Sequence, residues 1–174
     1  MHNRATAEQR EADYMKDKIA SLIDESYFIF NKKKKVQYSL EFNSLKNTMD
    51  AKPYKGKTGL YVLYDSSLSV AWYVGKSEKP IQGIQGRFTR HCDRIYGRAS
   101  DKPMPAWVVL EQWIKNNQYD FSYKTEVAVL ITEPNQYISL AEAQLIVDLE
   151  PLVNKETFDE GKFYSLLRGS LGGN

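Results

Sequence analysis

Residues suited to phosphoryl chemistry occur in a fixed order along the last two thirds of the chain. Two tyrosines, Tyr61 and Tyr73, precede Arg87 and His91, and the carboxylate of Glu142 follows much later. A carboxylate supplies the hard oxygen ligands that Mg²⁺ or Mn²⁺ prefers. The guanidinium of an arginine is a planar fork of donors that fits the oxygens of a phosphate. With a group that takes a proton from water, this set could hydrolyse a phosphodiester, and its single carboxylate favours one metal ion over two.

Each tyrosine belongs to a tripeptide that also contains a glycine. Gly-Leu-Tyr occupies residues 59–61, and Tyr-Val-Gly occupies residues 73–75. Such tripeptides are common in strands, where tyrosines usually pack as core or cross-strand aromatic residues. Taken alone, Tyr61 and Tyr73 would therefore favour a structural role.

The residues after the tripeptides make the pattern more specific. Arg87 and His91 lie four apart in Gly-Arg-Phe-Thr-Arg-His, on one face of an expected helix. Glu142 is followed after nine residues by Pro151 and after twelve by Asn154. Together with the tripeptides, this order of motifs resembles that of the GIY-YIG nucleases.

The resemblance covers residues 58–154 and implies a role for each residue. Tyr61 would be the general base, Tyr73 would orient water or phosphate, and Arg87 would be the catalytic arginine. Glu142 would hold one Mg²⁺ or Mn²⁺ ion. Because the reference pKa of tyrosine is about 10, Tyr61 would need a lowered pKa or would act through a bound water. The expected catalytic residues are Tyr61, Tyr73, Arg87, His91, Glu142 and Asn154, of which Asn154 would fix the hydrogen bonds of the site.

Glu142 and Asn154 also have structural interpretations. The segment Ser139-Leu-Ala-Glu142 matches a capping box, in which Glu142 would bind back to the start of its helix. Glu142 also shares a helical face with Leu145, Ile146 and Leu149, which predicts that its carboxylate points toward the sheet, where an uncompensated charge would be costly. Asn154 fits a turn residue after the preceding proline.

Positive charge is concentrated in two segments, although the net charge of the chain is only +2. Residues 1–57 carry 12 Lys and Arg against 8 Asp and Glu, residues 76–102 carry 7 against 3, and residues 103–174 carry 5 against 10. This distribution can present a basic face to phosphates, and ordinary solvated faces are the alternative. Lys76 and His91 could also assist proton transfer or grip phosphate. The residues expected to bind nucleic acid are Lys33, Lys34, Lys76, Arg90 and Arg94.

The composition predicts one globular catalytic unit. The 174 residues suffice for one domain with an extension, and 42% hydrophobic with 26% charged residues is an ordinary globular mixture. The single cysteine, Cys92, cannot form an internal disulfide. No apolar run approaches the roughly 20 residues that cross a bilayer, and residues 1–18 lack the apolar core of a secretion signal. A cytoplasmic protein without a membrane partner is therefore expected.

Hydrophobic periodicity predicts the elements that must position these residues. A helix is expected over residues 5–30, and residues 38–42 are either a short strand or a docking segment. Strands at 58–65 and 69–75, helices at 83–95 and 103–116, a strand at 121–132 and a helix at 139–149 follow. The expected fold class is α/β (α+β), a small mixed three-stranded sheet with flanking helices in the order β-β-α-α-β-α. The expected divisions are an N-terminal helical and basic extension (1–57), a catalytic domain (58–160) and a tail (161–174).

Together these expectations predict a metal-dependent DNA endonuclease, and a restriction-type enzyme is one kind that it could be. The choice of DNA follows from the family resemblance, and cutting both strands would favour a homodimer. No small-molecule cofactor is expected. A catalytically silent nucleic-acid-binding module on the same scaffold is the alternative, and a protein-interaction domain is a third possibility. The carboxylate of Glu142 favours the enzyme, because a binding module needs a basic face but no metal ligand.

Overall fold

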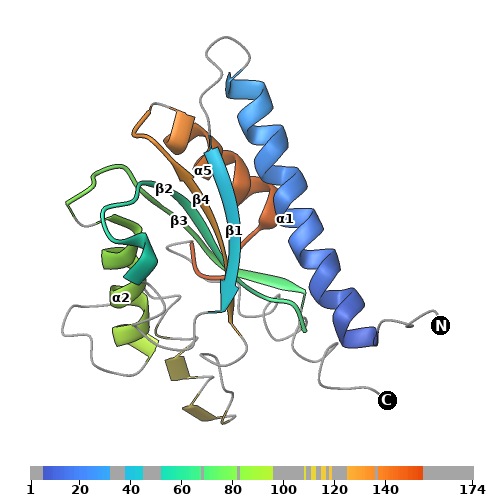
Figure 1. The fold of residues 1–174 in the computed structure, drawn as a ribbon. Helices are drawn as coiled ribbons and strands as arrows, with labels where there is room; N and C mark the ends of the chain where they lie inside the picture. Colours follow the sequence, from blue (N-terminus) through green and yellow to red (C-terminus); the bar gives the residue numbers. More distant parts are fainter. Residues whose placement is uncertain are drawn as a thin grey trace.

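Among the residues that it describes, the computed structural model contains seven helices and strands, and the four strands form one sheet (Figure 1). They are α1 (Ala7–Asn31), β1 (Tyr38–Ser44), β2 (Gly59–Asp65), β3 (Val70–Ser77), α2 (Gly83–Ile95), β4 (Glu126–Thr132) and α5 (Tyr137–Leu149). The structure describes residues 6–31, 38–44, 52–67, 69–81, 83–95, 125–135 and 137–154, together with residues 108, 111–112, 115–116 and 118. Most of the helix expected over 103–116 and the whole tail at 161–174 lie outside these residues.

The sheet has four strands in the order β1-β4-β2-β3, and every neighbouring pair is antiparallel. The expected mixed three-stranded sheet is therefore wrong in strand number and in strand direction. The additional strand is β1, which runs antiparallel to β4 from Tyr38 opposite Thr132 to Ser44 opposite Glu126. Its alternating pattern is short, so the sequence left open whether this segment is a strand or docks in another way. The pairing with β4 decides for the strand.

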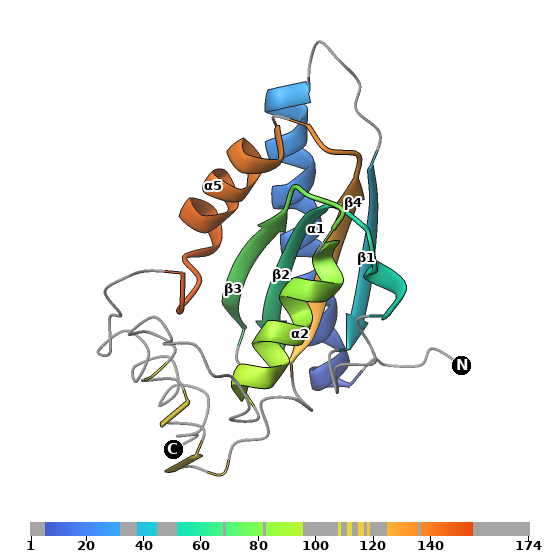
Figure 2. The same ribbon diagram turned by 90° about the vertical axis from the view of Figure 1, so that its left-hand side faces the viewer.

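Helices cover both faces of the sheet. In Figure 2, α2 lies in front of the sheet, whereas α1 lies behind it and α5 lies beside β3. Because side chains alternate along a strand, Leu60 and Val62 of β2 point to the side of α1 and α5. Tyr61 lies between them and points to the side of α2, where it meets His91. The two faces of β2 therefore serve different purposes, one for the main core and one for the tyrosine cluster.

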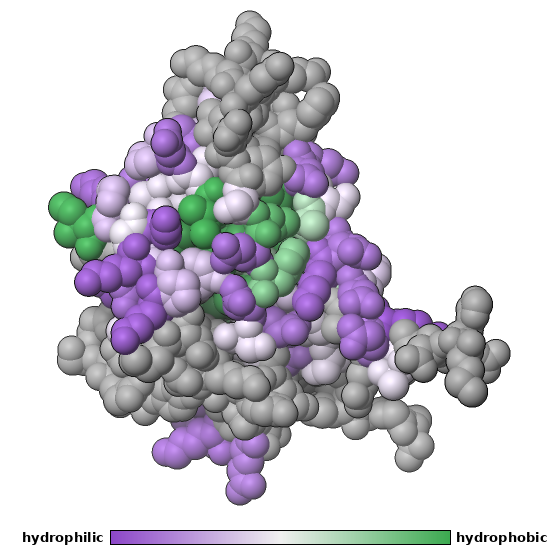
Figure 3. Space-filling model, viewed as in Figure 1, coloured by the Kyte–Doolittle hydropathy of each residue, from purple (hydrophilic) through white to green (hydrophobic). Residues whose placement is uncertain are grey.

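The segment before Thr58 contributes to the same core as the rest of the chain. Met15, Ile19 and Ile23 follow one another at intervals of four along α1, and all three are fully buried. They pack in one hydrophobic cluster with Ile138, Ala141 and Leu145 of α5. Hydrophobic surface is visible in the middle of the molecule, in the region of β1 (Figure 3). Within the described residues, no helix is long and apolar enough to span a bilayer.

Candidate active site

Close packing within the sheet requires the glycines of both tripeptides. Tyr61 and Gly75 are direct partners in the pairing of β2 with β3. A Cβ atom on Gly75 would lie 2.7 Å from Cε1 of Tyr73 and still closer to Cζ and the hydroxyl of Tyr61. Gly59 has a φ of 145°, and a Cβ atom there would collide with the carbonyl group of Leu130. Gly75 thus makes room for both tyrosine rings, and Gly59 permits close approach of β2 to β4.

Tyr61, Tyr73 and His91 form one cluster between the hairpin and α2. The Tyr61 hydroxyl lies 2.9 Å from Nε2 of His91. The rings of Tyr73 and His91 have centroids 4.6 Å apart, and those of Tyr61 and Tyr73 are 6.0 Å apart. Tyr61 is 1% exposed and His91 is 8% exposed, whereas Tyr73 is only partly buried. The structure therefore brings together three of the predicted catalytic residues and leaves Tyr73 as the one nearest solvent.

Burial strongly affects the acidity of both tyrosines. It raises the pKa of Tyr61 well above its ordinary value, Tyr73 raises it further, and the charge of Arg87 acts in the opposite direction. Burial also raises the pKa of Tyr73. A tyrosine that acts as a base would need a lowered pKa, whereas the environment of Tyr61 raises its pKa. Both hydroxyls are protonated near neutral pH, and when Nε2 of His91 is unprotonated, the Tyr61 hydroxyl donates to it.

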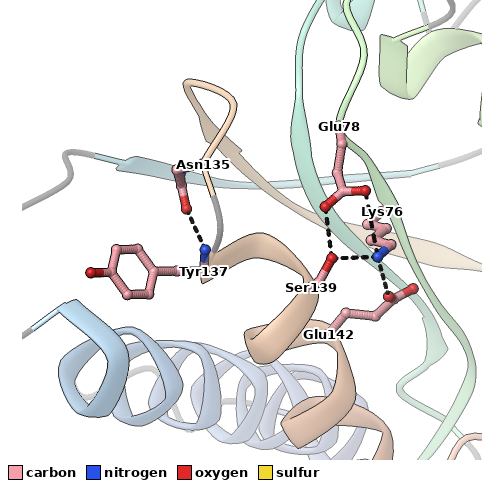
Figure 4. A network of polar contacts seen from close by, with 6 residues as sticks. All are labelled: Lys76, Glu78, Asn135, Tyr137, Ser139 and Glu142. Atoms are coloured by element: carbon pink, nitrogen blue, oxygen red, sulfur yellow. Dashed lines mark hydrogen bonds and ion pairs between the residues drawn. The ribbon is translucent and has the colours of Figure 1, made fainter.

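Glu142 belongs to a polar network that joins α5 to β3 (Figure 4). Its carboxylate lies 3.4 Å from Nζ of Lys76, and the same ammonium group lies 3.5 Å from the carboxylate of Glu78. Lys76 also donates to Oγ of Ser139 at 2.5 Å, and the Ser139 hydroxyl donates to Glu78 at 2.7 Å. Burial raises the pKa of Glu142, while Lys76 lowers it. Glu142 is thus a partly desolvated carboxylate that already has a cationic partner.

The capping interpretation of Glu142 is wrong, because α5 begins earlier than the sequence predicted. The helix starts at Tyr137, and its backbone N–H donates to the side-chain oxygen of Asn135 at 2.9 Å. Asn135 is therefore the capping residue. Ser139 lies inside the first turns, and its hydroxyl binds side chains rather than backbone. Glu142 is consequently free of a capping role and contacts Lys76 on the sheet.

Arg87 lies on α2, four residues before His91. It is exposed and lines a cleft of about 440 Å³, together with Ser77, Glu78, Lys79 and Ile81. Its charge lowers the pKa of Tyr61, Tyr73 and Glu142, so its field reaches all three groups. Glu142 acts on the same tyrosines in the opposite sense. The described lining of the cleft includes neither tyrosine, nor His91, nor Glu142, so an anion that entered it would meet Arg87 and Lys79.

Asn154 holds the outer edge of β3. Its side-chain oxygen accepts from the N–H of Val74 at 2.7 Å, and its side-chain amide donates to the Val74 carbonyl at 2.6 Å. Residues 152 and 153 continue this contact, because their N–H groups donate to the carbonyls of Ala71 and Trp72. Val74 lies between Tyr73 and Gly75, so Asn154 fixes the backbone that carries the second tripeptide.

A single divalent cation is compatible with the described donors. No group of three or more His, Cys, Asp and Glu side chains that could hold a metal occurs among the described residues. Mg²⁺ typically binds through one or two carboxylates and completes its shell with water and phosphate, which Glu142 can accommodate. Its carboxylate faces a cation, Lys76, at 3.4 Å, so the position suits positive charge.

The residues predicted to bind nucleic acid are described only in part. Lys76 lies in the network around Glu142, and Arg90 is exposed on α2. Arg94 lies within α2, but the structure does not describe its side chain. Lys33 and Lys34 lie outside the described residues. Glu78 and Ser139 were missed from the sequence. Glu78 had a usable signal, since it follows Lys76 by two residues, whereas the pattern around Ser139 pointed to capping.

Comparison of the chain with protein-family models, with curated proteins and with solved structures finds no match.

Proposed function

We propose that this protein is a metal-dependent DNA endonuclease that hydrolyses phosphodiester bonds. One observation carries the proposal: residues from β3, α2 and α5 all act on the hydroxyl of Tyr61, which lies on β2. His91 contacts it at 2.9 Å, and Tyr73, Arg87 and Glu142 each shift its pKa. A proton-transfer group, an anion-binding arginine and a hard oxygen ligand that all influence one buried hydroxyl are the parts that phosphodiester hydrolysis needs.

Exposure of the tyrosines determines how a proton would move. Tyr61 is 1% exposed, so the attacking water meets Tyr73 before it meets Tyr61. The ring of Tyr73 packs beside that of Tyr61, with centroids 6.0 Å apart, and the Tyr61 hydroxyl in turn contacts His91. The water gives a proton to the Tyr73 oxygen as Tyr73 passes its own to Tyr61, and Tyr61 passes its own to Nε2 of His91. As the water oxygen bonds to phosphorus, the P–O bond to the leaving oxygen breaks, and that oxygen takes a proton from solvent. His91 ends as the imidazolium, and no tyrosinate needs to form.

The remaining residues act on the phosphate. Arg87 binds two of its oxygens through its fork of donors and neutralises charge that grows on them. When bound at Glu142, a divalent cation would supply Lewis acidity and positive charge beside the phosphate. Asn154 contributes indirectly, because it holds the Val74 backbone next to Tyr73. DNA is proposed over RNA on the resemblance of the motifs alone, and cleavage of both strands would require two sites, as in a homodimer.

Plasmid cleavage tests the proposal directly. Supercoiled DNA is incubated with the protein, with and without Mg²⁺ or Mn²⁺, beside Glu142→Gln and Arg87→Ala. The controls are Asp148→Asn, which removes an exposed carboxylate elsewhere on α5, and Arg10→Ala, which removes an exposed cation of α1. We expect metal-dependent nicking by the wild type and both controls and a loss of at least about 100-fold in the two site variants. Equal nicking by all five proteins would reject the site.

A catalytically silent nucleic-acid-binding module is the second candidate. It is favoured by the contact of Lys76 with Glu142, since the carboxylate already has a cation and needs no metal for compensation. This candidate predicts that the protein retards DNA in a gel without any metal-dependent cleavage. It also predicts that Glu142→Gln leaves the affinity for DNA unchanged, whereas Arg87→Ala weakens it.

A further inference from the structure

The ammonium group of Lys76 is surrounded by three oxygen acceptors (Figure 4). Ser139 Oγ is the nearest at 2.5 Å, and the carboxylates of Glu142 and Glu78 follow at 3.4 and 3.5 Å. An ammonium group has three N–H donors, so each of these contacts can be made at once. The lysine therefore lies between the proposed metal ligand on one side and a serine with a second carboxylate on the other.

The serine and Glu78 form a complete acceptor chain without Glu142. Lys76 donates to the Ser139 oxygen, and the Ser139 hydroxyl donates onward to Glu78 at 2.7 Å. If the contact with Glu142 were broken, the ammonium group would still have a hydrogen-bonded acceptor and a carboxylate beside it. Rotation about the terminal bonds of the long lysine side chain can move the ammonium group away from Glu142 and toward Ser139 and Glu78.

The two carboxylates differ in how well water can compensate them. The side chain of Glu142 is 20% exposed, whereas that of Glu78 is 44% exposed. A partly buried carboxylate depends on a nearby cation more than a solvated one does. Without a metal, Lys76 supplies that cation to Glu142. A divalent cation at the same carboxylate would repel the ammonium group, and the two cannot share the position.

We propose that Ser139 and Glu78 form a second binding position for the Lys76 ammonium group, which lets Lys76 leave Glu142 when a divalent cation binds there. This inference rests on the proposed function, because it assumes that Glu142 is the metal ligand. Ser139 and Glu78 are then positioning residues that act through Lys76. They make metal binding an exchange of one cation for another, so the Glu142 carboxylate is never left uncompensated.

Binding of Mn²⁺ in the absence of DNA, followed by calorimetry at mildly alkaline pH and constant salt, tests the exchange. Removal of the second position in Glu78→Gln is expected to weaken Mn²⁺ binding by about two- to fivefold, the size of a partly exposed ion pair. Ser139→Ala should act in the same direction. Lys76→Met removes the competing cation and should strengthen Mn²⁺ binding by a similar factor.

The decisive measurement is the double variant Lys76→Met/Glu78→Gln. If Glu78 acts by receiving Lys76, the double variant binds Mn²⁺ as Lys76→Met does, because there is no ammonium group left to receive. If Glu78 only attracts Mn²⁺ through its own charge, Glu78→Gln weakens binding equally with and without Lys76, and the exchange is overturned. Asp148→Asn, which removes a different exposed carboxylate, should leave Mn²⁺ binding unchanged.

Failure of the metal site itself gives a different result. If wild type and Glu142→Gln bind Mn²⁺ equally, Glu142 is not the ligand, and both the proposed function and the exchange are rejected. If Glu142→Gln abolishes Mn²⁺ binding while Glu78→Gln and Lys76→Met bind as the wild type does, only the exchange fails. Thermal unfolding of each variant verifies that its fold is intact.

Discussion

Replacement of Gly75 by alanine tests the proposed site through a single methyl group. The new Cβ atom would lie 2.7 Å from Cε1 of Tyr73 and closer still to the hydroxyl end of Tyr61, while ordinary contacts begin near 3.4 Å. Both rings face the added methyl group, and β3 is held from its other side by Asn154. The rings must therefore move, by about 1 Å, away from the positions that bring Tyr61 to His91.

A displacement of this size should affect activity much more than stability. Misplacement of a reacting group by about 1 Å can lower a rate about 100-fold, whereas one extra methyl group in a packed region costs about 1–3 kcal/mol of folding free energy. We expect Gly75→Ala to nick plasmid about 100-fold more slowly than the wild type in single-turnover assays with Mg²⁺, yet to remain folded at room temperature.

An independent readout is the imidazole of His91, one of only two histidines in the chain. With His2 replaced, the imidazole nitrogen resonances report on His91 alone. Its Nε2 shift should change in Gly75→Ala toward the value found in Tyr61→Phe, which lacks the hydroxyl. Gly59→Ala is the contrasting control, since its clash with the backbone of Leu130 should lower the melting temperature instead. A wild-type cleavage rate and an unshifted His91 resonance in Gly75→Ala would refute the reasoning.

Four further predictions follow from the charges and contacts of the site. The pKa of Tyr61 is raised in the folded protein, so the contribution of this proton to folding stability is full below a pH of about 10 and is lost as the pH rises further. Ultraviolet titration should therefore show no phenolate from Tyr61 before the protein unfolds, with Tyr61→Phe as the reference. The pKa of Glu142 is also raised, so protons compete with metal, and Mn²⁺ affinity measured by calorimetry should fall as the pH is lowered toward the titration of this carboxylate. Asn154→Asp places an acceptor against the Val74 carbonyl and should destabilise the fold by about 1–3 kcal/mol in urea, whereas an unchanged midpoint would exclude the edge contact. Arg90→Ala should reduce the salt dependence of DNA binding by about one unit in the log–log slope, and an unchanged slope would remove Arg90 from the interface.

Local patterns were sufficient for the elements that carry the candidate residues. The hairpin of β2 and β3, the helix α2 and the helix α5 all lie where periodicity and turn residues predicted them, to within a few residues. Tyr61, Arg87 and Glu142 consequently occupy the expected elements. These elements depend on contacts between near neighbours in the chain, so the pattern of residue types in one sequence is enough to predict them.

Features that depend on long-range pairing could not be obtained in this way. The pairing of β1 with β4 joins residues about 90 positions apart, and no local signal in either strand names its partner. Ser139 shows the opposite problem, because it satisfies a local capping rule that Asn135 fulfils instead. The raised pKa of Tyr61 likewise results from its burial, which only the assembled fold reveals.

The contact of Asn154 with Val74 also has a consequence for the order in which the protein is made. The two residues are 80 positions apart, so the outer edge of β3 lacks this partner until synthesis has passed residue 154. A shorter nascent chain, ending before Glu142, would already contain both tyrosine tripeptides and Arg87. It would lack the proposed metal ligand and the clamp on β3, so the proposed nuclease activity is withheld until these late segments have been added.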